Sequence, residues 1–351
     1  MNIVLFTPDV SANSVGRTYC LWLLAKQLDW HVTVVSTRGV SVWAPLSDTA
    51  FAQDCVVIPH SELDRSALIL NADLILAVKP VQSSFGIALE LSTRLRIPLL
   101  LDVDDPDLDA HLSWSRPHRR IAKQIVRPRA LATAKRLRAA ARSVPVIVSN
   151  PVLQARYGGT IVPHIRLDPG IGAPHVRSQP TIAFVGSNRQ HKGVSHLRKA
   201  VAKMQEFGLR LTITDTPPVD AKPWEDWTGP TSLEKGLGLV AGADIVVIPS
   251  LNLSYARGQL PAKLVDAMIM GRAIIVSNIE PMPWALGNHG VTIRPGSVRS
   301  IRKALRQVLD PQVRKALGDD ARVRALGMFT VESNTGVFSQ AIASAREAFT
   351  E

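Results

Sequence analysis

The chain has 351 residues, of which 46% are hydrophobic and 20% charged, and its formal net charge at pH 7 is +12. This length predicts about two domains, and the hydrophobic fraction excludes intrinsic disorder as a class. Cys20 and Cys55 are the only cysteines. The sequence therefore excludes a disulfide framework and a cysteine-rich zinc cluster.

The first residues and the hydropathy pattern indicate the compartment. Apolar runs stay shorter than the roughly 18 residues of a membrane-spanning helix, and the N-terminal residues lack the pattern of a secretory signal. We therefore expect a cytoplasmic protein. The pI of about 10.1 favours an anionic partner, such as nucleic acid, an acidic membrane face or phosphorylated substrates.

The first part of the chain alternates short apolar runs with helical stretches. Buried strands are predicted at residues 2–6, 31–36, 73–78, 97–102 and 144–149. A helix is predicted at 16–28, where apolar residues recur at helical spacing. Apolar strands separated by helices predict a parallel sheet that is covered on both faces. We expect residues 1–165 to form this first α/β domain.

A second series of the same kind follows a segment rich in proline and glycine, residues 166–179, which predicts a linker. Strands are expected at 181–185, 210–214, 244–249, 273–277 and 291–294, and helices at 194–207 and 261–270. The predicted architecture is two Rossmann-like, doubly wound α/β domains in tandem, the second over residues 180–336. Ligands bind such sheets beyond the carboxyl ends of the strands, and we expect the site in the cleft between the two domains.

The turn after the first strand of the second domain has a composition suited to phosphate. Residues 184–193 read Phe-Val-Gly-Ser-Asn-Arg-Gln-His-Lys-Gly and end beside a predicted helix start. Arg189 and Lys192 can neutralise phosphate charge, and the turn at Gly186 leaves backbone N–H groups for a ligand. The alternative is a solvated turn without a ligand. The residue order excludes a Walker loop.

A second phosphate site is predicted at the start of the helix at 261–270. Pro261 stands at its expected first position, so that neighbouring N–H groups are exposed at the positive helix end. Asp266 lies one turn further on, where it can accept a hydrogen bond from a sugar hydroxyl. The alternative is an ordinary capped helix. The donor-binding residues expected here are Gln259, Leu260, Pro261, Lys263 and Asp266.

Two features of the first domain are further candidates. Gly16 lies in the turn after the first strand, where a glycine allows close backbone approach at a helix start. Asp104 and Asp105 follow a central strand, and carboxylates there are costly unless they meet a ligand or cations. The alternative for these aspartates is a helix N-cap.

Other kinds of chemistry find little support in the sequence. The nine histidines lack metal-ligand spacing. Gly-x-Ser-x-Gly and a Gly-x-Gly-x-x-Gly after the first strand are both absent, which counts against a hydrolytic triad and a dinucleotide dehydrogenase. We expect neither a metal nor a bound cofactor.

These segments in this order resemble the GT-B glycosyltransferases, specifically the retaining glycosyltransferase family 4 group (group 1 glycosyl transferases). The resemblance covers nearly the whole chain and is carried most specifically by residues 184–193, 242–250 and 260–268. It implies a nucleotide-sugar donor held mainly by the second domain. It also implies that the last helix, about residues 337–349, returns to the N-terminal domain.

The resemblance implies roles for single residues of the second domain. Arg189 and Lys192 match the basic pair that holds the diphosphate and stabilises it as it leaves. Asp266 matches the second acid of the family's Glu-(seven residues)-Glu motif, which binds the donor ribose. The first acid of that motif is replaced by Gly258 in this sequence.

In the first domain, the resemblance places Gly16 near the diphosphate and acceptor, and Asp104 and Asp105 near the acceptor and the reacting sugar. We expect a retaining, hexosyltransferase-type enzyme that moves a sugar from a nucleotide-diphosphate sugar to a glycan or lipid-linked acceptor in cell-surface polysaccharide or glycolipid synthesis. The alternatives are a nucleotide-sugar epimerase and a non-catalytic GT-B subunit that binds nucleotide or membrane. Gly258 motivates the second alternative.

Most of the excess positive charge lies in one basic segment, residues 115–142. It contains no acid and ten basic residues: Arg116, Arg119, Arg120, Lys123, Arg127, Arg129, Lys135, Arg136, Arg138 and Arg142. Its amphipathic spacing predicts binding to an anionic membrane, chiefly through Arg119, Arg120, Lys123 and Arg127, and a peripheral position at the inner membrane face. The alternative is a solvated face. Nucleic acid is disfavoured because the segment has few aromatic residues and no recognised binding motif.

Overall fold

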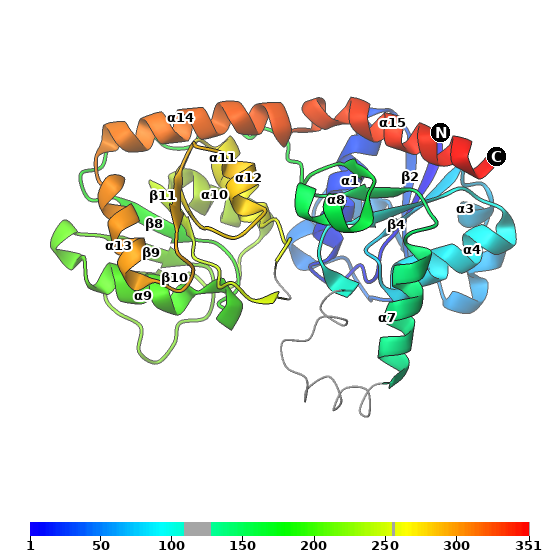
Figure 1. Ribbon diagram of the computed structural model, residues 1–351, viewed down its shortest axis with the longest axis horizontal. Helices are drawn as coiled ribbons and strands as arrows, with labels where there is room; N and C mark the ends of the chain where they lie inside the picture. Colours follow the sequence, from blue (N-terminus) through cyan, green and yellow to red (C-terminus); the bar gives the residue numbers. More distant parts are fainter. Residues whose placement is uncertain (109–127, 255–256, 351) are drawn as a thin grey trace. The chain divides into compact units, whose positions relative to one another are not determined.

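The computed structural model describes residues 1–108, 128–254 and 257–350. By its internal contacts the chain divides into two compact units. Unit 1 comprises Met1–Ile165, Ser254–Gln259 and Val331–Glu351, and unit 2 comprises Arg166–Leu253 and Leu260–Thr330. Each unit has an α/β architecture in which helices flank a central sheet (Figure 1).

Unit 1 is built on a seven-stranded parallel sheet with the order β3-β2-β1-β4-β5-β6-β7. Its strands are β1 (Asn2–Phe6), β2 (His31–Ser36), β3 (Cys55–Val57), β4 (Leu74–Val78), β5 (Leu99–Val103), β6 (Val146–Val148) and β7 (Thr160–Ile161). The register pairs Ile3 of β1 with Val32 on one side and Leu74 on the other. The central strands are buried throughout, because helices cover both faces of the sheet.

The helices of unit 1 connect these strands. They are α1 (Val15–Gln27), α2 (Ala50–Gln53), α3 (Ala67–Leu70), α4 (Ile87–Leu95), α7 (Pro128–Ala140), α8 (Pro151–Tyr157) and α15 (Val331–Thr350), with the short helices η1 (Ala44–Leu46), η2 (His60–Arg65) and η3 (Gln82–Gly86). The last helix, α15, packs against α1 and β5, and its Phe338, Ile342 and Ala345 are buried (Figure 1). It begins six residues earlier than the sequence predicted, at Val331.

Unit 2 repeats the architecture with a six-stranded parallel sheet of order β10-β9-β8-β11-β12-β13. Its strands are β8 (Thr181–Phe184), β9 (Arg210–Ile213), β10 (Glu225–Trp227), β11 (Ile245–Ile248), β12 (Ala273–Ser277) and β13 (Val291–Ile293). Its helices are α9 (Val194–Ala202), α10 (Leu233–Gly242), α11 (Ala262–Ile269), α12 (Met282–Leu286), α13 (Val298–Gln307) and α14 (Pro311–Met328), with η4 (Gln190–Lys192) and η5 (Gln205–Phe207).

Alternate residues of β11 face two different hydrophobic clusters. Val246 and Ile248 pack in the cluster that includes α11, and Ile245 and Val247 pack in the cluster that includes α9 and α13. This alternation follows from the two-residue period of a strand. The two parallel sheets with flanking helices confirm the predicted fold class. In both sheets the strand order reverses beside the first strand, which is where doubly wound folds bind ligands.

The predicted linker, residues 166–179, is an irregular segment that is grouped with unit 2 and hydrogen-bonded to it. The N–H groups of Gly172 and Ala173 donate to the carbonyls of Met270 and Ala241 at 3.0 and 2.8 Å. A Cβ at Gly172 would lie 2.6 Å from the Ala241 carbonyl oxygen, so only glycine fits this approach. Gly172 therefore serves close packing here, whereas a Cβ at Gly170 would meet open space.

None of the helices in the described residues has both the length and the apolar character needed to cross a lipid bilayer.

Candidate functional site in unit 2

The loop after β8 lies against the end of β9 and the first turn of α11. The Gly186 N–H donates to Thr214 Oγ1 at 2.6 Å, and the Asn188 N–H donates to the carboxylate of Asp215. Gly186 has a φ of +126°, and a Cβ there would lie 2.7 Å from Lys263 Nζ. A glycine is favoured at this position because side chains rarely adopt this φ, whereas the flexible end of Lys263 could move away from a Cβ.

A second glycine fixes the other end of this loop. Gly193 has a φ of +70°, and a Cβ there would lie 2.0 Å from the Pro249 carbonyl oxygen. The Leu251 N–H donates to the His191 carbonyl at 2.8 Å. The loops that follow β8 and β11 are therefore held together at the point where the strand order reverses.

Three basic side chains act on His191 in this loop. Burial lowers the pKa of His191, and the charges of Lys192, Arg189 and Lys263 lower it further. Arg189 is exposed, while His191 and Lys192 are half-buried. The structure thus brings the predicted basic pair, Arg189 and Lys192, together with Lys263 from α11.

The Lys263 ammonium lies over the ring of Phe184, 3.7 Å from its centroid. Burial lowers the pKa of Lys263 well below its usual value, and the nearby Lys192 charge acts in the same direction, against the opposing influence of Asp266. Among the described residues, Lys263 Nζ has no hydrogen-bond acceptor. Lys263 is therefore a half-buried basic group whose positive charge would be poorly compensated by the described residues.

Asp266 forms an ion pair that sequence reasoning missed. Arg166 Nε donates to Asp266 Oδ1 at 2.6 Å, and both side chains are largely buried. The two residues are 100 positions apart, so no local pattern links them. The predicted acceptor for a sugar hydroxyl already holds a cation from its own unit.

The start of α11 differs by one residue from the prediction. Pro261 is the N-cap, with an extended φ of −69° and ψ of 124°, and the helix begins at Ala262 without a side-chain cap. Leu260 is buried in the core of unit 2, so only its backbone can serve a ligand. Gln259 belongs to a segment of unit 1, and the structure does not group it with these residues.

The charged network of unit 1

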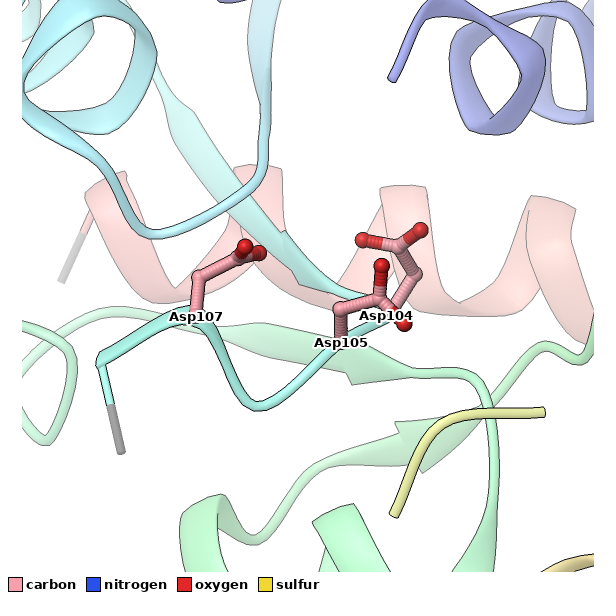
Figure 2. A group of neighbouring side chains, drawn as sticks. All are labelled: Asp104, Asp105 and Asp107. Carbon is pink, nitrogen blue, oxygen red and sulfur yellow. The ribbon is translucent and has the colours of Figure 1, made fainter. Parts of the chain in front are cut away.

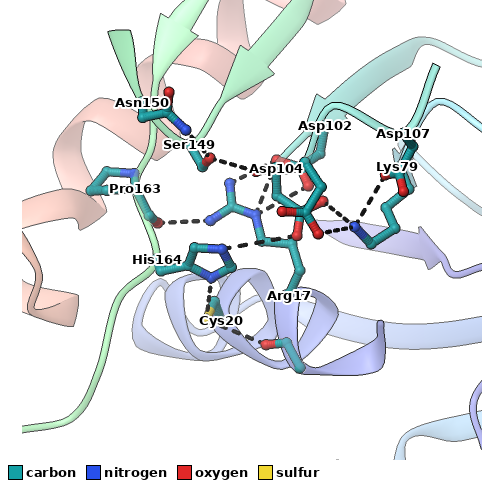
Figure 3. A network of polar contacts seen from close by, with 12 residues as sticks. Arg17, Cys20, Lys79, Asp102, Asp104, Asp107, Ser149, Asn150, Pro163 and His164 are labelled. Carbon is teal, nitrogen blue, oxygen red and sulfur yellow. Dashed lines mark hydrogen bonds and ion pairs between the residues drawn. The ribbon is translucent and has the colours of Figure 1, made fainter. Parts of the chain in front are cut away.

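At the corresponding edge of the unit 1 sheet, Arg17 of α1 is almost fully buried. Its Nε and Nη2 donate to the Asp102 carboxylate at 2.7–3.2 Å, and its Nη1 and Nη2 donate to the carbonyls of Pro163 and Val162 at 2.7 and 2.8 Å (Figure 3). Burial alone would lower the pKa of Arg17, but the Asp102 charge and hydrogen bond raise it above its usual value. The sequence analysis did not select Arg17.

Gly16 precedes this arginine as the second residue of α1. A Cβ there would come no nearer than 4.0 Å to Trp43, so the missing side chain leaves open space. The Gly16 N–H donates to the Asn13 carbonyl at 3.2 Å. Gly16 therefore offers room at the helix start, while its N–H is already used.

Asp104 and Asp105 meet a cation from their own unit. Lys79 Nζ lies 2.7 Å from Asp104, 3.0 Å from Asp105 and 3.2 Å from Asp107. Burial would lower the pKa of Lys79, but the three carboxylates raise it well above its usual value. Lys79 has a φ of +71°, a conformation that a residue other than glycine rarely adopts, at the turn that aims it into this cluster.

Figure 2 shows the three carboxylates as a group of the kind that could hold a metal ion, with one oxygen atom of each within 4.8 Å of the others. Because the Lys79 ammonium contacts all three, a metal ion would have to displace it. Burial raises the pKa of Asp107 to about 6, with Lys79 opposing the shift and the charges of Asp104 and Asp105 adding to it. That the protein needs no metal stays a prediction.

Further polar contacts extend the network (Figure 3). His164 Nε2 lies 3.9 Å from Asp104 Oδ2, and its Nδ1 lies 4.0 Å from Cys20 Sγ. Ser149 Oγ donates to the Asp104 carbonyl at 2.8 Å, and Asn150 Nδ2 donates to Ser149 Oγ at 2.9 Å. These contacts tie the loops after β5 and β6 to α1.

Asn150 also fixes the position where the resemblance places an acid. Its side chain caps α8, and its Nδ2 donates to the Gly258 carbonyl at 2.9 Å. Gly258 has a φ of +96°, and a Cβ there would lie 3.4 Å from Val152. A glutamate at this position would strain the backbone, because this φ is one that side chains rarely adopt.

The four residues predicted to bind a membrane, Arg119, Arg120, Lys123 and Arg127, lie outside the described residues. The C-terminal part of the basic segment forms α7. Ala134 and Leu137 on this helix are buried in the core of unit 1, whereas Arg129 and Lys135 are exposed. Arg136 Nη2 donates to Gln82 Oε1 at 2.6 Å. The α7 helix thus has one apolar face in the core and one basic face in solvent.

Similarity to known proteins

One region of the chain matches a known protein family. Residues 179–311 match the family model described as "Glycosyl transferases group 1". An uncharacterized glycosyltransferase from Methanocaldococcus jannaschii is 27% identical over 99 residues, which are 27% of this chain and 24% of that protein. The match thus spans about a quarter of the length of this curated relative.

Solved structures resemble nearly the whole chain at low sequence identity. Anabaena HepE in complex with UDP has a TM-score of 0.72 at 15% identity, over 98% of this chain and 100% of that one. Sucrose-phosphate synthase from Thermosynechococcus elongatus has a TM-score of 0.65 at 15% identity, over 99% and 100% of the two chains. WaaG, described as a glycosyltransferase involved in lipopolysaccharide biosynthesis, has a TM-score of 0.65 at 15% identity, over 95% and 99%.

These similarities establish the fold of the whole chain and the family of its second part. They confirm the resemblance at the level of the group 1 glycosyl transferases. Residues 179–311 are a glycosyl transferases group 1 domain, in a chain that has the GT-B fold.

Proposed function

We propose that this protein is a retaining glycosyltransferase that moves a hexosyl group from a nucleotide-diphosphate sugar to a glycan or lipid-linked acceptor. The observation that carries this proposal is the meeting of Arg189, Lys192 and Lys263 at the carboxyl end of β8 and the start of α11. The acid beside Lys263, Asp266, is already paired with Arg166. Basic side chains next to a helix N-terminus suit a diphosphate.

The chemistry explains why such a site would accelerate transfer. When the bond between the sugar and the phosphate oxygen breaks, negative charge grows on the departing diphosphate. We assign Arg189 and Lys192 to that charge, because fixed cations that strengthen their hold in the transition state raise the rate. The same cations would supply the charge that a metal ion provides in other enzymes.

The remaining predicted residues have places in this proposal. Gly186 and the backbone at Leu260 and Pro261 would adjoin the diphosphate, and Asp266, oriented by Arg166, would accept a hydrogen bond from the ribose. In unit 1, the space beside Gly16 and the carboxylates of Asp104 and Asp105 would serve the acceptor and the reacting sugar. Figure 3 shows the ion pair between Lys79 and Asp104, which would orient this carboxylate.

The similar proteins support the donor class and the type of acceptor. HepE was solved with UDP and with UDP-glucose, and WaaG is described as acting in lipopolysaccharide biosynthesis. A role in cell-surface polysaccharide or glycolipid synthesis follows as part of the proposal.

A calorimetric panel tests the donor site. UDP, GDP, ADP and TDP, each alone and as a sugar conjugate, are titrated into the protein with and without magnesium. We expect one nucleotide to bind in the absence of magnesium. Binding of none would contradict the donor site, and binding without transfer to any acceptor would favour a non-catalytic subunit.

We also propose that the basic segment holds the protein at an anionic membrane surface. The exposed Arg129 and Lys135 of α7 support this, since the apolar face of the helix is already in the core and its basic face remains available. The test is flotation with anionic vesicles after replacing Arg119, Arg120, Lys123 and Arg127 by Gln. We expect flotation to be lost, and unchanged, salt-insensitive flotation would contradict the proposal.

A further inference from the structure

We propose that Lys263 is a neutral amine in the empty site and takes up a proton from solvent when the diphosphate of the donor binds beside it. This inference rests on the proposed function, because it concerns the same donor site of unit 2. Binding of the nucleotide is thereby coupled to protonation of the Lys263 amine.

The surroundings of Lys263 favour the neutral amine. The ring of Phe184 covers one side of the Nζ atom, with its centroid 3.7 Å away, and Gly186 covers another. An ammonium has three N–H donors to satisfy, yet the described residues place no acceptor at this atom. The face of an aromatic ring attracts a cation only modestly and does not replace the lost hydration.

The charges around Lys263 also favour the neutral amine. On the loop after β8, Lys192 repels a positive charge on Lys263. Arg189 and His191 lie on the same loop, where Arg189, Lys192 and Lys263 all lower the pKa of His191. On its own helix, Asp266 attracts that charge, but Arg166 binds this carboxylate at 2.6 Å and neutralises much of its influence. Burial is the largest cause that lowers the pKa of Lys263, and Lys192 comes next.

A bound diphosphate reverses this balance. Its oxygens would provide the missing acceptors, and its negative charge would favour the protonated amine. In this step the lone pair of Nζ takes one proton from the buffer, and no other bond changes. Affinity should then be highest below the pKa of Lys263 in the empty protein, and it should fall as the pH rises from that value to the pKa in the complex.

Proton uptake can be measured directly by calorimetry on the full chain. UDP, or whichever of GDP, ADP and TDP binds, is titrated near pH 9 in two buffers of different ionisation enthalpy. At this pH an ordinary histidine, with a pKa of about 6.5, is already neutral. We expect the wild-type protein to take up a measurable fraction of one proton per bound nucleotide.

Proton uptake in variants shows which side chain takes up the proton. Lys263→Gln should bind without uptake, and so should Lys263→Arg, since a guanidinium keeps its charge at this pH. His191→Asn should retain the uptake. Nucleotide binding by the wild-type protein with no uptake anywhere between about pH 7 and 10, or uptake that survives in Lys263→Gln, would overturn the inference and leave the donor site intact. Failure of all four nucleotides to bind would overturn the proposed function as well.

Discussion

Both units gather charged side chains at the carboxyl edge of a parallel sheet, but they balance these charges differently. In unit 1, Arg17 is paired with Asp102, and Lys79 with three aspartates. In unit 2, three basic residues act together on His191, and the acid beside Lys263 is held by another arginine. The same place in the same kind of fold therefore carries a network of ion pairs with more acids than bases in one unit, and a cluster of basic side chains in the other.

The difference follows from the cost of burying charge. An ion in a protein interior is tolerated when it is paired and hydrogen-bonded, as Arg17 is by Asp102 and two carbonyls. Such a network fixes the backbone and orients its members. A basic group that is partly removed from water and has no acceptor, like Lys263, is favoured when it loses its proton or meets an anion. At this edge the charged side chains of unit 1 hold one another in place, whereas those of unit 2 suit the diphosphate of the proposed donor.

The largest effect is expected at Arg17. Arg17→Met would leave the Asp102 carboxylate buried without a partner, and removing one member of such a pair costs about 3–5 kcal/mol of unfolding free energy. Chemical denaturation measures this change. The control is Lys26→Met, which breaks a more exposed pair with Asp54 and should cost no more than about 1 kcal/mol. Equal losses in the two variants would show that the unit 1 network does not stabilise the fold.

A somewhat smaller effect is expected at Lys192, and on a different property. Lys192→Ala should lower the transfer rate about a hundred- to a thousandfold, because one contact to the developing charge is lost. Its unfolding free energy should stay close to that of the wild type. The matched control is Lys199→Ala on the exposed side of α9, which should leave transfer unchanged. A Lys192→Ala variant with nearly full activity would contradict the assignment of the diphosphate site.

The smallest effect concerns pH and Asp107. Its pKa of about 6 in the folded protein lies above the unfolded value of about 3.9, so the folded state binds more protons between these values. Stability is therefore lost as the pH rises through this window. Asp107→Asn should remove that dependence and gain about 1 kcal/mol at pH 8 relative to pH 4, a modest figure because the side chain is 30% exposed.

Unfolding curves at several pH values test this prediction, with the exposed Asp48→Asn as control. If Asp107→Asn and the wild type show the same slope between pH 4 and 6, Asp107 does not titrate in the network as described.

Much of the fold could be predicted from local sequence patterns. Apolar runs bounded by turn residues gave the strands and the fold class, because burial of both sheet faces imposes that pattern over a few residues. The loop with Gly186, Arg189 and Lys192 was also visible, since its glycines and basic residues are contiguous. These features depend on chain neighbours alone.

The rest depended on residues far apart in the chain. Arg17 and Asp102 are 85 positions apart, and Arg166 and Asp266 are 100 apart. Gly172 lies in the segment predicted as a linker but serves close packing, because only the folded unit 2 brings Ala241 and Met270 next to it. The sequence by itself determined the strands, the helices and the basic loop through local periodicity and composition. Only the tertiary structure decided which charges are paired within the chain, because the pairing depends on burial and on partners supplied by distant segments.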